Sequence, residues 1–135
     1  MNTVMRDFEV LCAQINLRAK ETYGYNQIED LLLKMLNFIK AHDDYRDSFV
    51  VYFSEKISGE GENDLVYGNY NHLIQIIQFC MREMQWPEIK EAAIRRKSAS
   101  SDWRVIGTMD QILEVYETEW PDDELYEYYS KEVKD

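Results

Sequence analysis

The chain has 135 residues, a length that suits one all-α domain over residues 1–135 and allows a hydrophobic core without disulfide bonds. Its composition, 45% hydrophobic and 13% aromatic with five glycines and two prolines, excludes a wholly disordered protein. The formal charge is −11, and direct nucleic-acid binding is disfavoured because a basic footprint is seen only at Arg95-Arg96-Lys97.

Hydrophobic residues recur at helical spacing from the N-terminus onward. The pattern predicts a first helix from about Thr3 to Thr22, a second from about Asn26 to Ala41 and a third from about Tyr45 to Ile57. Asp43 or Asp44 is expected to cap the third. The side chains expected to face inward are Val4, Phe8, Leu11, Cys12, Ile15, Ala19, Ile28, Leu32, Met35, Leu36, Ile39, Phe49, Val50, Tyr52, Phe53 and Ile57.

The segment from Phe49 to Phe53 is the one strand candidate, because β-branched and aromatic residues favour sheets. We expect it to be helical, since no second strand is apparent for it to pair with. After a polar loop from Ser58 to Asn63, a fourth helix is predicted from about Asn69 to Gln85. Its expected inward side chains are Leu73, Ile76, Ile77, Cys80, Met81 and Met84.

Two prolines and a polar linker divide the remaining chain. Pro87 suits the first turn of a fifth helix, which is expected to end near Lys97, where cationic side chains complement the helix dipole. Ser101 or Asp102 is expected to cap a sixth helix that reaches about Thr118. Pro121 is expected to open a short seventh.

Two internal echoes suggest repetition. Leu32–Phe38 matches Leu73–Phe79 at an offset of 41 residues, and Trp86-Pro87-Glu88 matches Trp120-Pro121-Asp122 at an offset of 34. Over about residues 26–130 the chain is similar in spacing to HEAT-like repeats. That similarity rests on hydrophobic pattern and implies a short α-α superhelix, but chance alignment of amphipathic helices explains the echoes equally well. Either origin predicts about six or seven helices packed as antiparallel hairpins.

Candidate chemistry elsewhere in the chain has simpler explanations. Asp43, Asp44 and Asp47 match a D-D-x-x-D pattern that can hold magnesium diphosphate, but acids at a helix start also serve the helix dipole. His42 and His72 lack further ligands at metal spacing, and no nucleophile or phosphate-cradling motif is present. We therefore predict no enzyme activity, catalytic residue, metal or cofactor. Whether the three aspartates bind a metal stays open.

The two cysteines and the N-terminal residues indicate the cellular compartment of the protein. Cys12 and Cys80 lie among apolar neighbours and are expected to fill the core as thiols, although a disulfide between them is an alternative. Asp7 and Glu9 stand where a secretory signal needs cationic and apolar residues, and no apolar run approaches the roughly 18 residues of a membrane span. We expect a cytoplasmic protein.

The last 35 residues carry the strongest functional signal. They hold eleven acidic and three basic side chains, with tryptophans and tyrosines among them. Trp103 and Trp120 are expected to pack into the core, because large rings at helix ends usually close one, whereas the place of Tyr116 stays open. The predicted partner-binding residues are Glu117, Glu119, Asp122, Asp123, Glu124, Tyr126, Glu127, Tyr128 and Tyr129.

This acid-aromatic block predicts a non-catalytic module that binds a basic protein partner, for example an immunity or antitoxin-type inhibitor of a toxin nuclease. The alternatives are a helical-repeat adaptor that binds through its middle helices, a DNA mimic with acids along one face, and a small magnesium enzyme. Oligomeric state and the partner's identity are not predicted.

Overall fold

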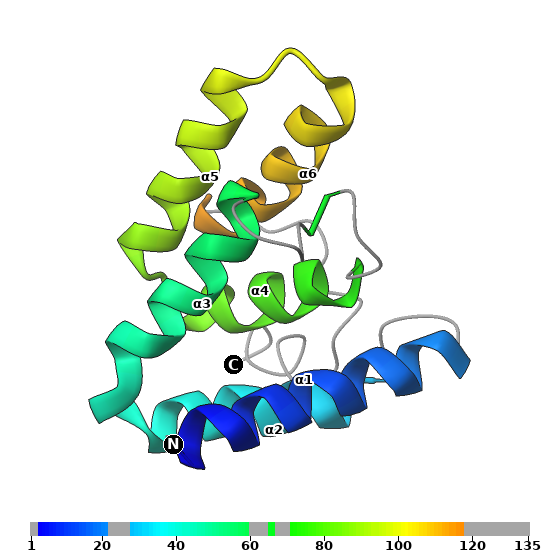
Figure 1. Ribbon diagram of the computed structural model, residues 1–135, viewed down its shortest axis with the longest axis vertical. Helices are drawn as coiled ribbons and strands as arrows, with labels where there is room; N and C mark the ends of the chain where they lie inside the picture. The colour runs from blue at the N-terminus through cyan, green and yellow to red at the C-terminus, as the bar shows by residue number, and fades with distance from the viewer. Residues whose placement is uncertain (1–2, 22–27, 60–64, 67–70, 118–135) are drawn as a thin grey trace, which may run out of the picture.

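The computed structural model describes residues 3–21, 28–59, 65–66 and 71–117. Within these ranges the chain forms helices and no strand (Figure 1), which confirms the all-α class. A 3₁₀ turn, η2, precedes the third helix, and another, η3, follows the sixth. The elements are α1 (Thr3–Glu21), α2 (Glu29–Ala41), η2 (Asp43–Tyr45), α3 (Arg46–Ser58), α4 (Asn71–Met84), α5 (Pro87–Ala99), α6 (Trp103–Leu113) and η3 (Glu114–Tyr116).

Two antiparallel hairpins frame the molecule. α1 and α2 lie side by side at the base of Figure 1, and an ion pair of 3.2 Å joins Arg18 to Asp30. α5 and α6 form the second hairpin at the top. Lys97 in the last turn of α5 pairs with Asp110 of α6 at 2.6 Å, and the Tyr116 hydroxyl donates to the Trp86 carbonyl at 2.8 Å near the open end of the hairpin.

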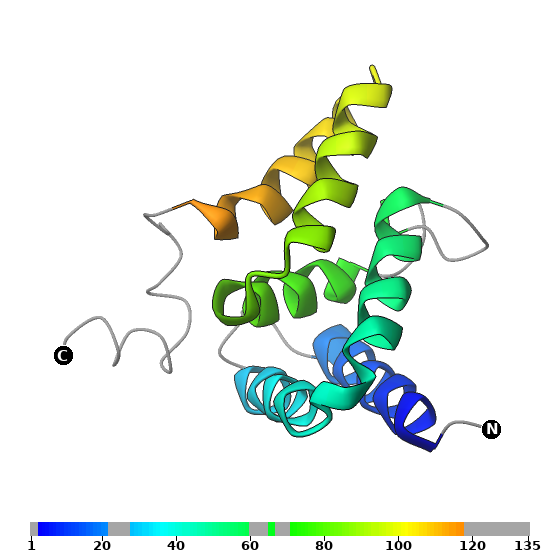
Figure 2. The same cartoon turned by 90° about the vertical axis from the view of Figure 1, so that its left-hand side faces the viewer.

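The third helix packs mainly against α5, and the two run in parallel (Figure 2). Their first turns are joined by Arg46, whose guanidinium donates two hydrogen bonds of 2.8 Å to Glu88. Their last turns are joined by Arg96, which donates to the Ile57 carbonyl at 2.9 Å. This carbonyl lies in the last turn of α3, where carbonyl groups lack partners within the helix.

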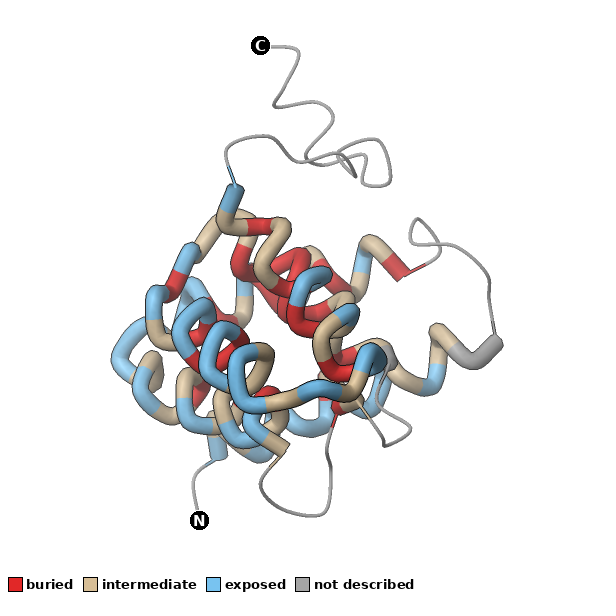
Figure 3. The backbone as a smooth tube through the Cα atoms, turned by 90° about the horizontal axis from the view of Figure 1, so that it is seen from above, coloured by how far each residue is buried: buried red, intermediate tan, exposed pale blue. Residues whose placement is uncertain are grey.

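The centre of the fold is α4. Its six consecutive residues Ile76 to Met81 are all buried, whereas a helix that packs on one side buries only a stripe. α4 packs against α1, α2 and α6, so helices from both ends of the chain meet on it. Figure 3 shows the buried residues, in red, gathered toward the inside of the molecule. The buried Gln78 of α4 is satisfied by a 3.0 Å hydrogen bond to the Gln111 carbonyl. A HEAT-like superhelix, which stacks hairpins in chain order, is not confirmed.

An aromatic cluster ties α1 to α3. The Phe8 ring is fully buried, and its centroid lies 5.0 Å from Phe49, 4.9 Å from Tyr52 and 5.6 Å from Phe53. Phe38 of α2 adds a contact of 6.2 Å with Phe49. Such spacings are favourable for aromatic pairs. The segment that offered a strand therefore forms a helix, because its large rings pack against α1 and α2 instead of against a second strand.

The helix ends test the predicted stop and start signals. Asp102 caps α6, since its carboxylate accepts from the Arg104 backbone N–H at 2.9 Å, and Pro87 occupies the first turn of α5, both as predicted. The predicted cap by Asp43 or Asp44 is wrong. Both residues lie within η2, Tyr45 occupies the cap position of α3, and no side chain caps that helix.

The sixth helix is shorter than predicted. Its α-helical part ends at Leu113, and the chain then tightens into η3, so that the helical conformation stops at Tyr116 instead of Thr118. Such 3₁₀ turns are common at the end of an α-helix. The predicted seventh helix at Pro121 lies outside the described residues.

Candidate functional site

Only the start of the predicted partner-binding block can be placed. Glu117 follows η3 directly, and its side chain is exposed. It lies near the open end of the α5–α6 hairpin, one residue after the tyrosine that bonds to Trp86. The other predicted residues lie outside the described ranges and stay predictions: Glu119, Asp122, Asp123, Glu124, Tyr126, Glu127, Tyr128 and Tyr129.

Tyr116 belongs to the fold. Its ring is half-buried and packs against the core, and burial raises the pKa of its hydroxyl well above the usual value. The Lys90 ammonium lies 5.9 Å from the ring centroid. Trp86 beside it is 5% exposed, and the Arg46 guanidinium covers its ring at 5.2 Å. These contacts join the starts of α3 and α5 to the end of the chain's described part.

The prediction that Trp103 packs into the core is wrong. Its side chain is 78% exposed. The inward face of α6 is made by Val105, Met109 and Ile112, which follow one another at helical spacing. Trp103 lies on the opposite face. This spacing was available in the sequence, so helical periodicity could have identified the exposed indole.

A shallow hollow lies beside Trp103. Its volume is about 300 Å³, and Gly107 forms part of its wall one helical turn after the indole. A methyl group added at Gly107 would meet no atom within 4 Å, so nothing inside the described fold requires a glycine there. The complete lining is Val66, Trp103, Arg104, Gly107, Thr108 and Gln111.

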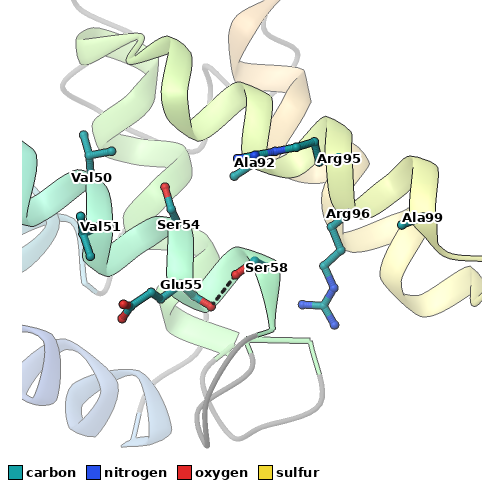
Figure 4. Close-up of a pocket in the computed structure, with 9 residues that line it drawn as sticks. All are labelled: Val50, Val51, Ser54, Glu55, Ser58, Ala92, Arg95, Arg96 and Ala99. Atoms are coloured by element: carbon teal, nitrogen blue, oxygen red, sulfur yellow. Dashed lines mark hydrogen bonds between the residues drawn. The ribbon is translucent and has the colours of Figure 1, made fainter.

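A larger groove of about 490 Å³ lies at the surface along the α3–α5 contact (Figure 4). Apolar and small side chains face it from both helices, and Val51 is 54% exposed there. Arg96 extends from α5 toward the end of α3, and Arg95 lies along α5. The lining comprises Val50, Val51, Ser54, Glu55, Ser58, Ala92, Arg95, Arg96 and Ala99. Sequence reasoning missed this groove because it treated each helix separately.

The aspartate triplet does not form a metal cluster. Asp43, Asp44 and Asp47 are all exposed, and Asp47 approaches Arg46 at 3.9 Å. Among the residues with described positions, no group of three His, Cys, Asp or Glu side chains is arranged to hold a metal ion. His42 is the C-cap residue of α2, and its Nδ1 lies 2.8 Å from the Phe38 carbonyl.

Both cysteines are free thiols in the core region. Cys80 is buried and Cys12 is half-buried. Burial raises the pKa of Cys12 to about 12 and also raises that of Cys80. Since the thiolate is the reactive form, neither sulfur is activated as a nucleophile. The expected role as core fillers agrees with this burial.

Comparison with protein-family models, curated proteins and solved structures gives no match. In the described part of the chain, no helix combines the length and apolar character needed to cross a bilayer. The candidate sites therefore rest on the geometry and charge of this chain alone.

Proposed function

We propose that this protein is a non-catalytic binding module for a basic protein partner. The observation that supports it best is the net charge of −8 over residues 101–135, a stretch that also contains Trp103, which is 78% exposed. Acidic side chains increase the rate of encounter with a cationic surface, and exposed aromatic rings supply buried anchors once contact is made.

The most specific form of this proposal is an immunity or antitoxin-type inhibitor that covers the basic, nucleic-acid-binding site of a toxin. The partner-binding block begins at the exposed Glu117 and continues through the predicted residues up to Tyr129. We also propose a cytoplasmic location, because two free thiols are typical of a reducing compartment.

Matched charge neutralisation tests the proposal. One variant carries Glu117→Gln, Glu119→Gln and Asp122→Asn, and the control carries Asp43→Asn, Asp44→Asn and Asp47→Asn, so both lose three charges. Basic proteins captured from the native host are identified, purified and titrated against each variant. We expect the first variant to bind at least about tenfold more weakly at low salt and the control to bind nearly as wild type. Equal binding by both variants would show that the partner-binding block is not the binding surface.

The α3–α5 groove supports a second candidate, a helical adaptor that binds through its middle helices. Its walls are the parallel helices α3 and α5, and the lining side chains recur along them at helical spacing. A groove of this form can receive a helix of a partner. Val51→Arg would obstruct this groove and leave the terminal block unchanged. Loss of the captured partner in Val51→Arg alone would favour the adaptor.

A further inference from the structure

The groove along the α3–α5 contact has an apolar floor that nothing in the described fold covers. Val51 is 54% exposed there, and Ala92 faces the same hollow from α5. Small side chains line much of the remaining wall, namely those of Ser54, Ser58 and Ala99. Because the distance between packed helices depends on the side chains at their contact, these small residues allow another helix to approach closely.

Two charged side chains flank this floor from opposite walls. Glu55 belongs to α3 and Arg95 to α5, and both are exposed. Figure 4 shows that Glu55 leaves α3 on the side turned away from α5, whereas Arg95 lies along α5. Neither side chain has an ion-pair or hydrogen-bond partner among the described residues. The groove therefore offers a free carboxylate on one edge and a free guanidinium on the other.

The two charges lie at about the same height along the groove. Arg96 of α5 donates to the Ile57 carbonyl of α3 at 2.9 Å, which sets these parts of the parallel helices side by side. Glu55 is two residues before Ile57, and Arg95 is one residue before Arg96. A segment that lies along the groove would meet both charges within one helical turn.

The form and the charges of the groove select among possible occupants. An extended peptide binds by adding to a sheet edge, and the described part of the chain contains no strand. A wholly acidic segment would be repelled by Glu55, and a wholly basic one by Arg95. An amphipathic helix with charges of both signs avoids both repulsions. Helices of coiled coils use this arrangement, in which charges beside an apolar stripe determine partner and orientation.

We propose that the α3–α5 groove binds an amphipathic helix of a protein partner, with carboxylates along one edge of its apolar stripe and cationic side chains along the other. The apolar stripe covers Val51 and Ala92, the carboxylates face Arg95, and the cations face Glu55. This inference rests on the second candidate function and specifies its ligand. Reversing a helix exchanges its edges, so the two charges also fix the direction in which a given helix binds.

A synthetic helical peptide of about 20 residues is the probe. It carries leucines at helical spacing, glutamates along one edge and the same number of lysines along the other, so its net charge is zero. The overall charge of −11 therefore has little influence on its binding. Fluorescence anisotropy of the labelled peptide measures affinity at about 20 mM salt, at concentrations where the peptide alone is monomeric.

Charge reversal at the two edges tests the assignment. Arg95→Glu makes both edges acidic and Glu55→Arg makes both basic, so we expect each to weaken peptide binding about three- to tenfold. Glu55→Arg together with Arg95→Glu recovers most of the affinity, because the peptide then binds in the reverse direction. Val51→Arg obstructs the floor and weakens binding more than about tenfold. Asp7→Arg and Lys34→Glu, which reverse exposed charges on α1 and α2, are the matched controls and bind as wild type does.

Circular dichroism of every variant checks that the fold is retained, and the possible outcomes separate the proposals. If the wild-type protein does not bind the peptide, or Val51→Arg binds it equally well, both this inference and the adaptor function fail, and the acidic binding module is unaffected. If Val51→Arg loses binding but the single charge reversals do not, or their combination fails to recover it, the adaptor function stands and the charged edges are wrongly assigned.

Discussion

At the scale of single residues, Trp86 and Trp103 show how similar positions acquire different roles. Each stands at the start of a helix, Trp86 before α5 and Trp103 in α6. Trp86 is covered by Arg46 and bonded through its carbonyl to Tyr116, whereas Trp103 is exposed. The difference comes from neighbours that are distant in the chain, which a rule about rings at helix ends does not include.

The ion pair between Arg46 and Glu88 gives a pH-dependent contribution to stability. The hydrogen-bonded guanidinium lowers the pKa of Glu88 to about 2. Because this pKa is depressed in the folded state, the contribution is complete above the usual pKa of about 4.5 and is lost as pH falls through about 2. Both side chains are partly exposed, at 32% and 43%, so screening limits the effect.

We therefore expect Glu88→Gln to lower the free energy of unfolding by about 0.5–1 kcal/mol at neutral pH. The difference from wild type should shrink as pH falls from 5 to 2, as measured by urea denaturation across this range. Glu91→Gln is the control, since Glu91 is exposed on the same helix. A Glu88→Gln effect that stays constant down to pH 2 would contradict the assignment to this ion pair.

At the scale of elements, helical periodicity predicted the buried residues of an outer helix, α2, better than those of the central helix, α4. The predicted inward residues of α2 are all buried, because that helix packs on one side and its periodic stripe identifies this side. For α4 the set of inward residues predicted from periodicity did not include every buried residue. Phe79 and Gln78 are also buried, since neighbouring helices cover α4 on more than one face.

The aromatic cluster around Phe8 should make α1 essential to stability. Phe8→Ala removes a fully buried ring that contacts three others, and we expect the free energy of unfolding to fall by about 3–5 kcal/mol. Val10→Ala on the same helix, where Val10 is 51% exposed, should change it by less than about 0.5 kcal/mol. Urea denaturation followed by circular dichroism measures both. Comparable losses in the two variants would mean that α1 is not anchored by its aromatic face.

At the scale of the whole molecule, the charge of −11 acts against compactness. Ion pairs such as Arg18–Asp30 and Lys97–Asp110 offset it locally, yet the chain has 26 acidic side chains and only 15 basic ones. The same excess would attract a basic partner. Stability and the proposed binding are thus expected to respond to salt in opposite directions.

We expect Tm to rise by a few degrees when salt is increased from about 10 to about 200 mM, because screening weakens the self-repulsion. Affinity for a basic partner should fall over the same range. Differential scanning fluorimetry with and without salt measures the first effect, and sucrose at equal osmolality is the control for solvent effects. A Tm that falls with salt would show that attractive ion pairs outweigh the repulsion.

The sequence alone determined the all-α class, the approximate bounds of six helices and most of the core. These follow from local periodicity and from residues such as Pro87 and Asp102, whose effects act within a turn or two. Only the tertiary structure decided the central position of α4 and the parallel packing of α3 on α5. Each of these depends on which distant helices meet, and a pattern that repeats every 3.6 residues describes the faces of a helix without identifying what covers them.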